Sequence, residues 1–283
     1  MPAFATPEPI TVVADVAVGA LTLIASDRTD TVVTVRPSDP GKQGDVKAAD
    51  EARVDLHDGT LVVQTSKSWR YFATLGGTGS VDVTIDLPTG SALRGSSVGP
   101  LFTQGVLGAC EWNSRAGDVR IDEAARLDLR ASAGAVVVGR VHGTADVVVG
   151  AGGVRIRELD ADATVKNPNG ATEIALTTGT LRVNGAHGHI VIGRSLGATT
   201  ARCAHGDIRV EEAVSGSLQL ETSYGGIEVG VPEGTAAWLD ASSQHGLVRN
   251  LLTDATGPDE SDHTVEVRAS TGYGEVVVRR PHA

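Results

Sequence analysis

Aromatic residues and cysteines are scarce in this sequence. Only 3% of its 283 residues are Phe, Trp or Tyr, and its two cysteines are Cys110 and Cys203. Two cysteines make neither a disulfide framework nor a cysteine-rich metal motif. We therefore expect two buried free thiols.

Long hydrophobic runs are also missing. No stretch reaches the roughly 18 consecutive apolar residues that a membrane-spanning helix requires. The first residues, Met-Pro-Ala-Phe-Ala-Thr-Pro, lack the basic segment and the apolar segment of a secretory signal. We therefore expect a cytoplasmic protein that does not insert into membranes.

Basic residues are in the minority. The 24 Lys and Arg residues are outnumbered by 35 Asp and Glu residues, which gives a formal net charge of −11. An acidic surface repels the phosphates of nucleic acids and of anionic lipids. We therefore expect no nucleic-acid partner.

Glycine and small aliphatic residues are abundant instead. The chain has 35 glycines, and 41% of its residues are hydrophobic although few are aromatic. The core must therefore consist mainly of Val, Leu, Ile and Ala held between many tight turns, which is typical of an all-β protein.

A repeat organises most of the chain. A glycine followed by an aliphatic-x-aliphatic strand recurs at intervals of roughly 18 residues, beginning at Gly117, Gly134, Gly152, Gly170, Gly188, Gly206 and Gly225. A second short strand follows in most units, for example Leu181-Arg-Val183. Aliphatic and polar residues alternate in these strands, so the aliphatic side chains should point inward.

Stacking these units one on the next predicts a parallel β-solenoid. Each coil contains two short strands, and equivalent residues of adjacent coils should lie roughly 4.8 Å apart. We assign residues 101–280 to the regular solenoid. Residues 8–100 form a less regular β region, either the first coils of the same solenoid or a small independent β domain, with one short helix at residues 47–53.

These segments resemble a known family. The serial Gly-x-Val/Ile-x-Val/Ile coils, the Val81-Asp-Val-Thr-Ile-Asp-Leu-Pro motif and the closing segment from Arg268 to Arg279 are similar to the bacterial putative-adhesin family of β-strand-repeat proteins. The resemblance covers nearly the whole chain. It implies a β-solenoid of unknown function and carries no catalytic residues.

Two histidine-containing corners occupy the same phase of the repeat. His187 should stack over His205, and His189 over Asp207, with Tyr224 and His245 continuing the first column. Three imidazoles and a carboxylate are an acceptable ligand set for zinc. We weigh this candidate metal site against a polar, exposed turn, and otherwise expect no cofactor.

A second cluster holds aromatic residues. Trp69, Arg70, Tyr71 and Phe72 are consecutive. Exposed aromatic side chains next to arginine favour contacts with proteins or glycans. The alternative is that these rings cap an end of the solenoid or pack in its core.

The sequence favours a non-catalytic scaffold or binding protein. We expect the outward residues of the coils to mediate protein–protein contacts or self-association, because an uncapped solenoid ends in unpaired strands. The alternative is an enzyme, either metal-dependent or glycan-processing, built on a β-helix. A third hypothesis is an exported surface protein with adhesive function.

Overall fold

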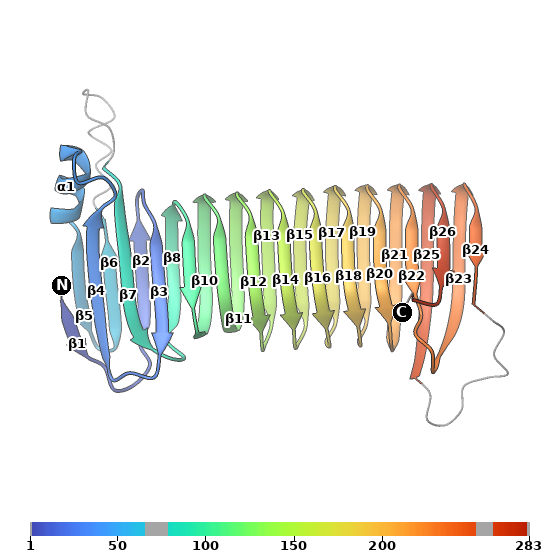
Figure 1. The fold of residues 1–283 in the computed structure, drawn as a ribbon, viewed down its shortest axis with the longest axis horizontal. Coiled ribbons are helices and arrows are strands. Elements are labelled where there is room, and N and C mark those ends of the chain that lie inside the picture. The colour runs from blue at the N-terminus through green and yellow to red at the C-terminus, as the bar shows by residue number, and fades with distance from the viewer. Residues whose placement is uncertain (1, 66–78, 253–262, 282–283) are drawn as a thin grey trace. The chain divides into compact units, whose positions relative to one another are not determined.

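The computed structural model describes residues 2–65, 79–252 and 263–281 (Figure 1). The described residues form twenty-six strands and one α-helix. Packing divides the chain into two compact units, Met1–His142 and Gly143–Ala283. The predicted boundary near residue 100 stays a prediction. Among the described residues, no helix has the length and apolar character needed to cross a membrane.

The first unit contains twelve of the strands. They are β1 Ala3–Ala5, β2 Thr11–Val16, β3 Leu21–Ser26, β4 Asp30–Pro37, β5 Arg53–His57, β6 Thr60–Gln64, β7 Val81–Pro88, β8 Ala92–Val98, β9 Leu101–Gln104, β10 Val106–Ala116, β11 Val119–Ala133 and β12 Val136–Val141. Two parallel ladders, β6–β2–β8–β10–β11 and β7–β3–β9–β11–β12, build the walls of the coils.

Antiparallel pairs complete this unit. Strand β4 pairs antiparallel with β7 and with β1, and β5 pairs antiparallel with β6. The β5–β6 hairpin turns at Asp58 and Gly59, whose φ angles are 46° and 71°. Two successive positive φ values suit a tight hairpin turn, for which Asp-Gly is a favoured sequence. These strands cover the outer edges of β6 and β7, so this end of the first unit is capped.

Helix α1, Gln43–Asp50, lies beside the antiparallel strands of the first unit. It begins before residue 47 and ends before residue 53, so the predicted helix at residues 47–53 overlaps only its second half. The buried Asp45 explains the early start, because its carboxylate accepts hydrogen bonds from the backbone N–H groups of Asp39 and Ser80. The Ser80 contact is distant in sequence, so helical propensity alone could not locate this helix.

The second unit is the regular solenoid. Its strands are β13 Ala145–Ala151, β14 Val154–Leu159, β15 Ala163–Asn169, β16 Thr172–Thr177, β17 Leu181–His187, β18 Ile190–Ser195, β19 Thr199–His205, β20 Ile208–Ala213, β21 Gly216–Tyr224, β22 Ile227–Gly230, β23 Thr235–His245, β24 Val248–Asn250, β25 His263–Tyr273 and β26 Val276–Arg279. The strand pairs between the described residues of this unit are parallel, for example Ile174↔Ile192 and Ile192↔Val210. The predicted parallel β-solenoid with two short strands per coil is confirmed.

Inward aliphatic columns form the core of the second unit. Ile156, Ile174, Ile192, Val210 and Val229 follow one another across successive coils and are almost completely buried. Their strand neighbours Arg155 and Arg209 point outward, as the period-2 alternation predicts. The burial pattern therefore follows the sequence pattern strand by strand.

The last coil of the chain does not lie at the end of the stack. Strand β25 pairs with β21 on one side and with β23 on the other, and β26 lies likewise between β22 and β24 (Figure 1). The earlier strands β23 and β24 thus form the outermost coil, which we call the terminal rung. The order of coils in space therefore differs from their order in the chain.

Inward polar side chains support the glycine corners. Asn167 Nδ2, Thr222 Oγ1 and Thr271 Oγ1 donate hydrogen bonds of 3.0, 2.9 and 2.8 Å to corner glycine carbonyls of adjacent coils. The Cys203 thiol donates in the same way to the Gly188 carbonyl, at 3.2 Å. Cys203 therefore has a structural role equivalent to that of the two threonines.

Candidate functional site

Five aromatic rings stack in one exposed column, which we call the ring column. Its members are His187, His205, Tyr224, Tyr273 and His245, in that spatial order. The first three intervals between ring centroids are 5.0 Å and the last is 4.4 Å, with interplanar angles of 20° or less. Each residue ends its strand, just before the corner glycine, so the parallel register alone aligns the rings.

The predicted stacking of His187 on His205 is confirmed. Tyr273 was not predicted in this column, and it separates Tyr224 from His245 because β25 lies between β21 and β23. The missed signal is Tyr273-Gly-Glu-Val, which has the same phase relative to its corner glycine as Tyr224-Gly.

The ring orientation does not favour zinc binding. Imidazole nitrogens bind metals through lone pairs in the ring plane, and face-to-face rings direct these lone pairs side by side rather than toward one ion. Asp207 Oδ1 accepts a hydrogen bond of 2.7 Å from the Gly226 N–H. In residues 2–65, 79–252 and 263–281, no group of three or more His, Cys, Asp or Glu is placed to hold a metal ion. Zinc at His187, His189, His205 and Asp207 stays a prediction.

The second predicted cluster lies outside the described residues. Trp69, Arg70, Tyr71 and Phe72 all fall in the segment 66–78. Their role in binding or in capping therefore stays a prediction.

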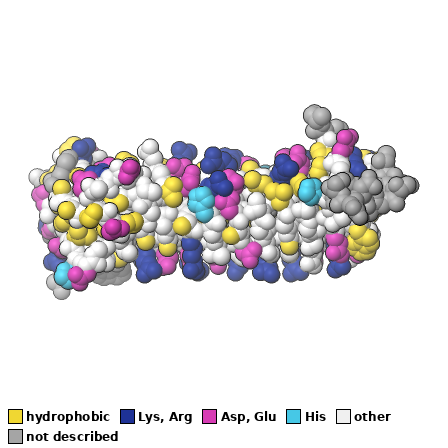
Figure 2. All heavy atoms as spheres, turned by 90° about the horizontal axis from the view of Figure 1, so that it is seen from below, with side chains coloured by type: hydrophobic (Ala, Val, Ile, Leu, Met, Phe, Trp, Pro, Cys, Tyr) yellow, Lys and Arg dark blue, Asp and Glu magenta, His cyan; other side chains and the backbone are white. Residues whose placement is uncertain are grey.

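Ion pairs between adjacent coils cover much of the outward surface of the second unit. Arg155 Nε lies 2.8 Å from Glu173 Oε2, and Arg194 Nε lies 3.6 Å from Glu212 Oε2. The hydrogen bond from Arg155 lowers the pKa of Glu173 and raises the pKa of Arg155 itself. On the face in Figure 2, basic and acidic side chains accordingly lie next to one another rather than in large patches of one sign.

Small residues interrupt these charges and leave a trough. The outward side chains of one column are Arg157, Ala175, Gly193 and Glu211, on β14, β16, β18 and β20. A hollow of about 710 Å³ lies above Ala175 and Gly193, and its lining includes Arg157 and Glu211. This trough was not predicted from the sequence, although two small outward residues between two charged ones are its visible signal.

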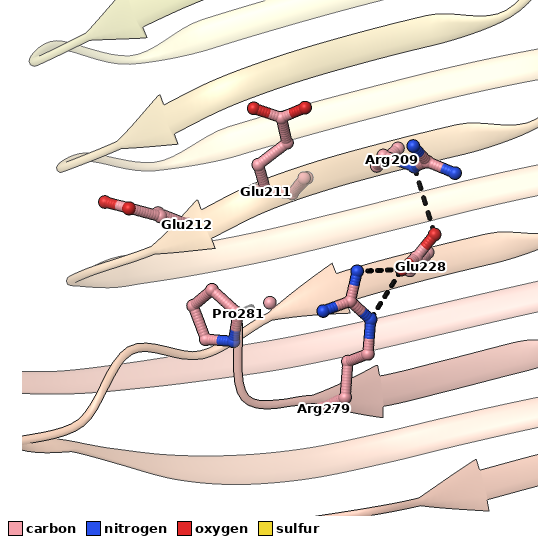
Figure 3. A pocket seen from close by; sticks show the side chains of 8 residues that line it. Arg209, Glu211, Glu212, Glu228, Arg279 and Pro281 are labelled. Carbon is pink, nitrogen blue, oxygen red and sulfur yellow. Dashed lines mark hydrogen bonds and ion pairs between the residues drawn. The ribbon is translucent and has the colours of Figure 1, made fainter. Parts of the chain in front are cut away.

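A smaller hollow of about 280 Å³ continues along the same column above Gly230 (Figure 3). Here Glu228 bridges two arginines, because its carboxylate lies 3.0 Å from Arg209 Nε and 2.6 Å from Arg279 Nη2. Glu211 lines both hollows and makes none of the contacts drawn in Figure 3.

The terminal rung exposes apolar side chains. Trp238, Leu247, Val248 and Leu251 are 56, 61, 46 and 60% exposed, respectively. Val248 is the register partner of Val276, which is completely buried. Among the described residues, β23 and β24 pair only with β25 and β26, so no further coil covers this side of the core.

Sequence comparison places this solenoid in a family. The family model described as Toastrack DUF4097 matches residues 19–281. The chain belongs to the Toastrack DUF4097 family. This match confirms the resemblance indicated by the repeated glycine coils. The matched residues include most of the first unit as well as the regular second unit.

Solved structures similar to this Toastrack chain share little sequence with it. A putative adhesin from Bacteroides fragilis NCTC 9343 is 12% identical, with a TM-score of 0.44, and the match covers 98% of this chain and 95% of that one. A putative adhesin from Parabacteroides merdae ATCC 43184 is 11% identical, with a TM-score of 0.40, covering 98% and 94%. A putative lipid-binding protein from Parabacteroides distasonis ATCC 8503 is 14% identical, with a TM-score of 0.43, covering 97% and 95%. Nothing among the curated proteins matches.

The two cysteines of the Toastrack chain are free and buried, as predicted. Burial raises the pKa of Cys110 to about 12 and also raises that of Cys203. Near neutral pH both thiols are therefore protonated and poor nucleophiles.

We expect neither thiol to react with Ellman's reagent in the native protein and both to react in guanidinium chloride. Rapid reaction of one native thiol would contradict the assignment of both as buried.

These thiols also give a pH dependence of stability. In the unfolded chain they ionise near their ordinary pKa of about 9, whereas in the folded chain they stay protonated. The unfolded state therefore loses protons first, and the free energy of unfolding should fall as the pH rises above about 9. Urea titrations at increasing pH measure this effect, and a Cys110→Ala, Cys203→Ser double variant should reduce it.

Proposed function

We propose that this Toastrack chain is a non-catalytic binding scaffold that self-associates through its terminal rung. The observation that carries the proposal is the exposed apolar end of the second unit, formed by Trp238, Leu247, Val248 and Leu251. An open strand edge above an uncovered core is a template for pairing with another chain.

Charge favours a second copy as the partner. The whole chain has a formal charge of −11, but residues 235–252 contain one acidic residue, Asp240, and one basic residue, Arg249, so their formal charges cancel. Two copies can therefore bring these segments together without the direct repulsion expected of more acidic surfaces. A two-fold axis would pair β23 of one copy with β23 of the other.

The capped end of the first unit favours a dimer over a filament. The edges of β6 and β7 are already occupied by β5 and β4. Strand β5 also carries the charged Arg53 and Asp55, which discourage pairing with a further strand. The described residues of each chain present one open rung, so head-to-head association closes after two copies.

The carboxylates that line the hollows support a non-catalytic role. Glu173, Glu212 and Glu228 are held in ion pairs with arginines of neighbouring coils. The hydrogen bond from Arg155 lowers the pKa of Glu173, so this carboxylate is poorly suited to act as a general acid. The enzyme alternative, the cytoplasmic location and adhesion at a cell surface stay predictions.

Static light scattering during size exclusion tests the proposal. We expect the mass of the purified chain to approach twice 29.0 kDa as its concentration rises. Val248→Asp and, separately, Leu247→Asp should return the mass to that of the monomer, because each buries a charge in the apolar contact. Val46→Asp adds the same charge at an exposed valine of α1 and should leave the dimer intact.

Salt dependence gives a second readout. Two chains of net charge −11 repel each other at long range, so raising NaCl from about 20 to about 300 mM should increase the dimer fraction. A monomer at every concentration, or an unchanged dimer in both terminal-rung variants with native circular dichroism, would overturn self-association through this rung.

A further inference from the structure

The trough on β14, β16, β18 and β20 is a second candidate binding surface, separate from the terminal rung. Its floor is the exposed Ala175 and the adjacent Gly193, whose small size lowers the sheet surface between taller neighbours. Ion-paired side chains stand on both sides: Arg155 and Glu173 on one side over β14 and β16, and Arg194 and Glu212 on the other side over β18 and β20. The walls therefore run along the direction in which the coils stack.

The two ends of the trough carry unmatched charges. The side chains of Arg157 and Glu211 are exposed, and neither forms an ion pair or a hydrogen bond within the described residues. Most other charged residues on this part of the sheet are paired with a neighbouring coil. Arg157 and Glu211 are therefore available to a ligand with one acidic and one basic group.

The spacing of these charges matches an extended polypeptide. Arg157 and Glu211 lie three coils apart, which corresponds to roughly 14 Å at the usual strand spacing of about 4.8 Å. In an extended chain, positions i and i+4 are roughly 13–14 Å apart and point to the same side. An acidic side chain at one position and a basic one four residues along would reach both ends together.

The shape of the trough favours a single strand over other occupants. The flat sheet face of a second copy cannot enter between two walls of side chains, whereas one extended chain can. Sugar rings bind well against aromatic faces, and none of the described lining residues is aromatic.

We propose that this trough binds an extended polypeptide segment that carries an acidic residue and, four positions along, a basic residue. The acidic side chain pairs with Arg157 and the basic one with Glu211, while small residues between them lie over Ala175 and Gly193. This inference does not depend on the terminal rung, so its failure would leave the proposed self-association untouched.

Fluorescence anisotropy with two labelled peptides tests the spacing. The matched probe is a capped pentapeptide with aspartate first, arginine last, and threonine, serine and threonine between. The control probe has the same composition with aspartate and arginine adjacent. We expect the full-length chain to bind the matched probe about fivefold more tightly, because only that probe can form both exposed ion pairs at once.

Variants of the trough test the site. Arg157→Gln and Glu211→Gln should each weaken binding of the matched probe about three- to fivefold. Ala175→Phe should abolish binding by filling the trough. Arg182→Gln and Glu221→Gln remove the same charges from exposed positions on the other ladder, formed by β17, β19 and β21, and should leave probe binding unchanged.

Nuclear magnetic resonance locates the bound probe. The amide signals of Ala175 and Gly193 should shift when the matched probe is added to the native chain. In the Ala175→Phe variant, the amide signals of Gly193 and of other folded neighbours should not shift. Equal affinity for both probes, or unchanged binding in Ala175→Phe, would overturn the proposal. A fall in the mass of the native assembly caused by Ala175→Phe would also overturn it, because the trough would then contact a second copy.

Discussion

Replacing Gly170 by alanine should lower the free energy of unfolding by at least about 3 kcal/mol. Gly170 has a φ of 151°, and an added Cβ would lie 2.0 Å from the carbonyl oxygen of Gly152 in the adjacent coil. A real Cβ cannot approach a backbone oxygen so closely, so two coils must separate or the corner must change its conformation. Urea denaturation followed by far-UV circular dichroism measures the loss.

Gly153→Ala is the matched control. No atom lies within 4 Å of a Cβ built on Gly153, and its φ is outside the range that L residues avoid. Alanine also restricts the unfolded chain, so this variant should be neutral or up to about 1 kcal/mol more stable. If the two variants were destabilised equally, the close approach of adjacent coils would not be the reason that glycine is required at position 170.

Truncation of Ile192 should be the other large effect. Ile192 is fully buried between Ile174 and Val210 in the inward column of the second unit. Ile192→Ala leaves a cavity in the middle of a stack that close neighbours cannot fill, and should cost about 3–4 kcal/mol. The measurement is again the free energy of unfolding in urea.

The adjacent Val191 provides the control for this truncation. It lies on the same strand, points outward and is partly exposed. Val191→Ala removes fewer buried atoms and should cost less than about 1 kcal/mol. If both truncations had the same cost, the inward and outward assignment of β18 would be wrong.

The sequence predicted the regular part of the fold well because the interactions there are local. Each coil packs on its neighbour, so the register of Ile174, Ile192 and Val210 follows from a repeat of about 18 residues and from side-chain alternation. The stacking of His187 on His205 follows from the same register.

The candidate sites were predicted less completely. The trough depends on which outward residues find ion-pair partners, and the sequence pattern alone does not distinguish the paired Arg155 from the unpaired Arg157. Likewise, the antiparallel β5–β6 hairpin was not predicted, because its Asp58-Gly59 turn lies outside the repeat of about 18 residues.

Composition, glycine spacing and alternation thus determined the solenoid, its inward columns and the corner positions, since these arise between coils that follow one another in the chain. Only the tertiary structure decided where coils leave that order: β2 lies between β6 and β8, and β25 lies between β21 and β23. All parallel coils offer neighbours nearly the same backbone edge, so local patterns do not choose among them. Long-range packing selects the order, and with it the exposed terminal rung.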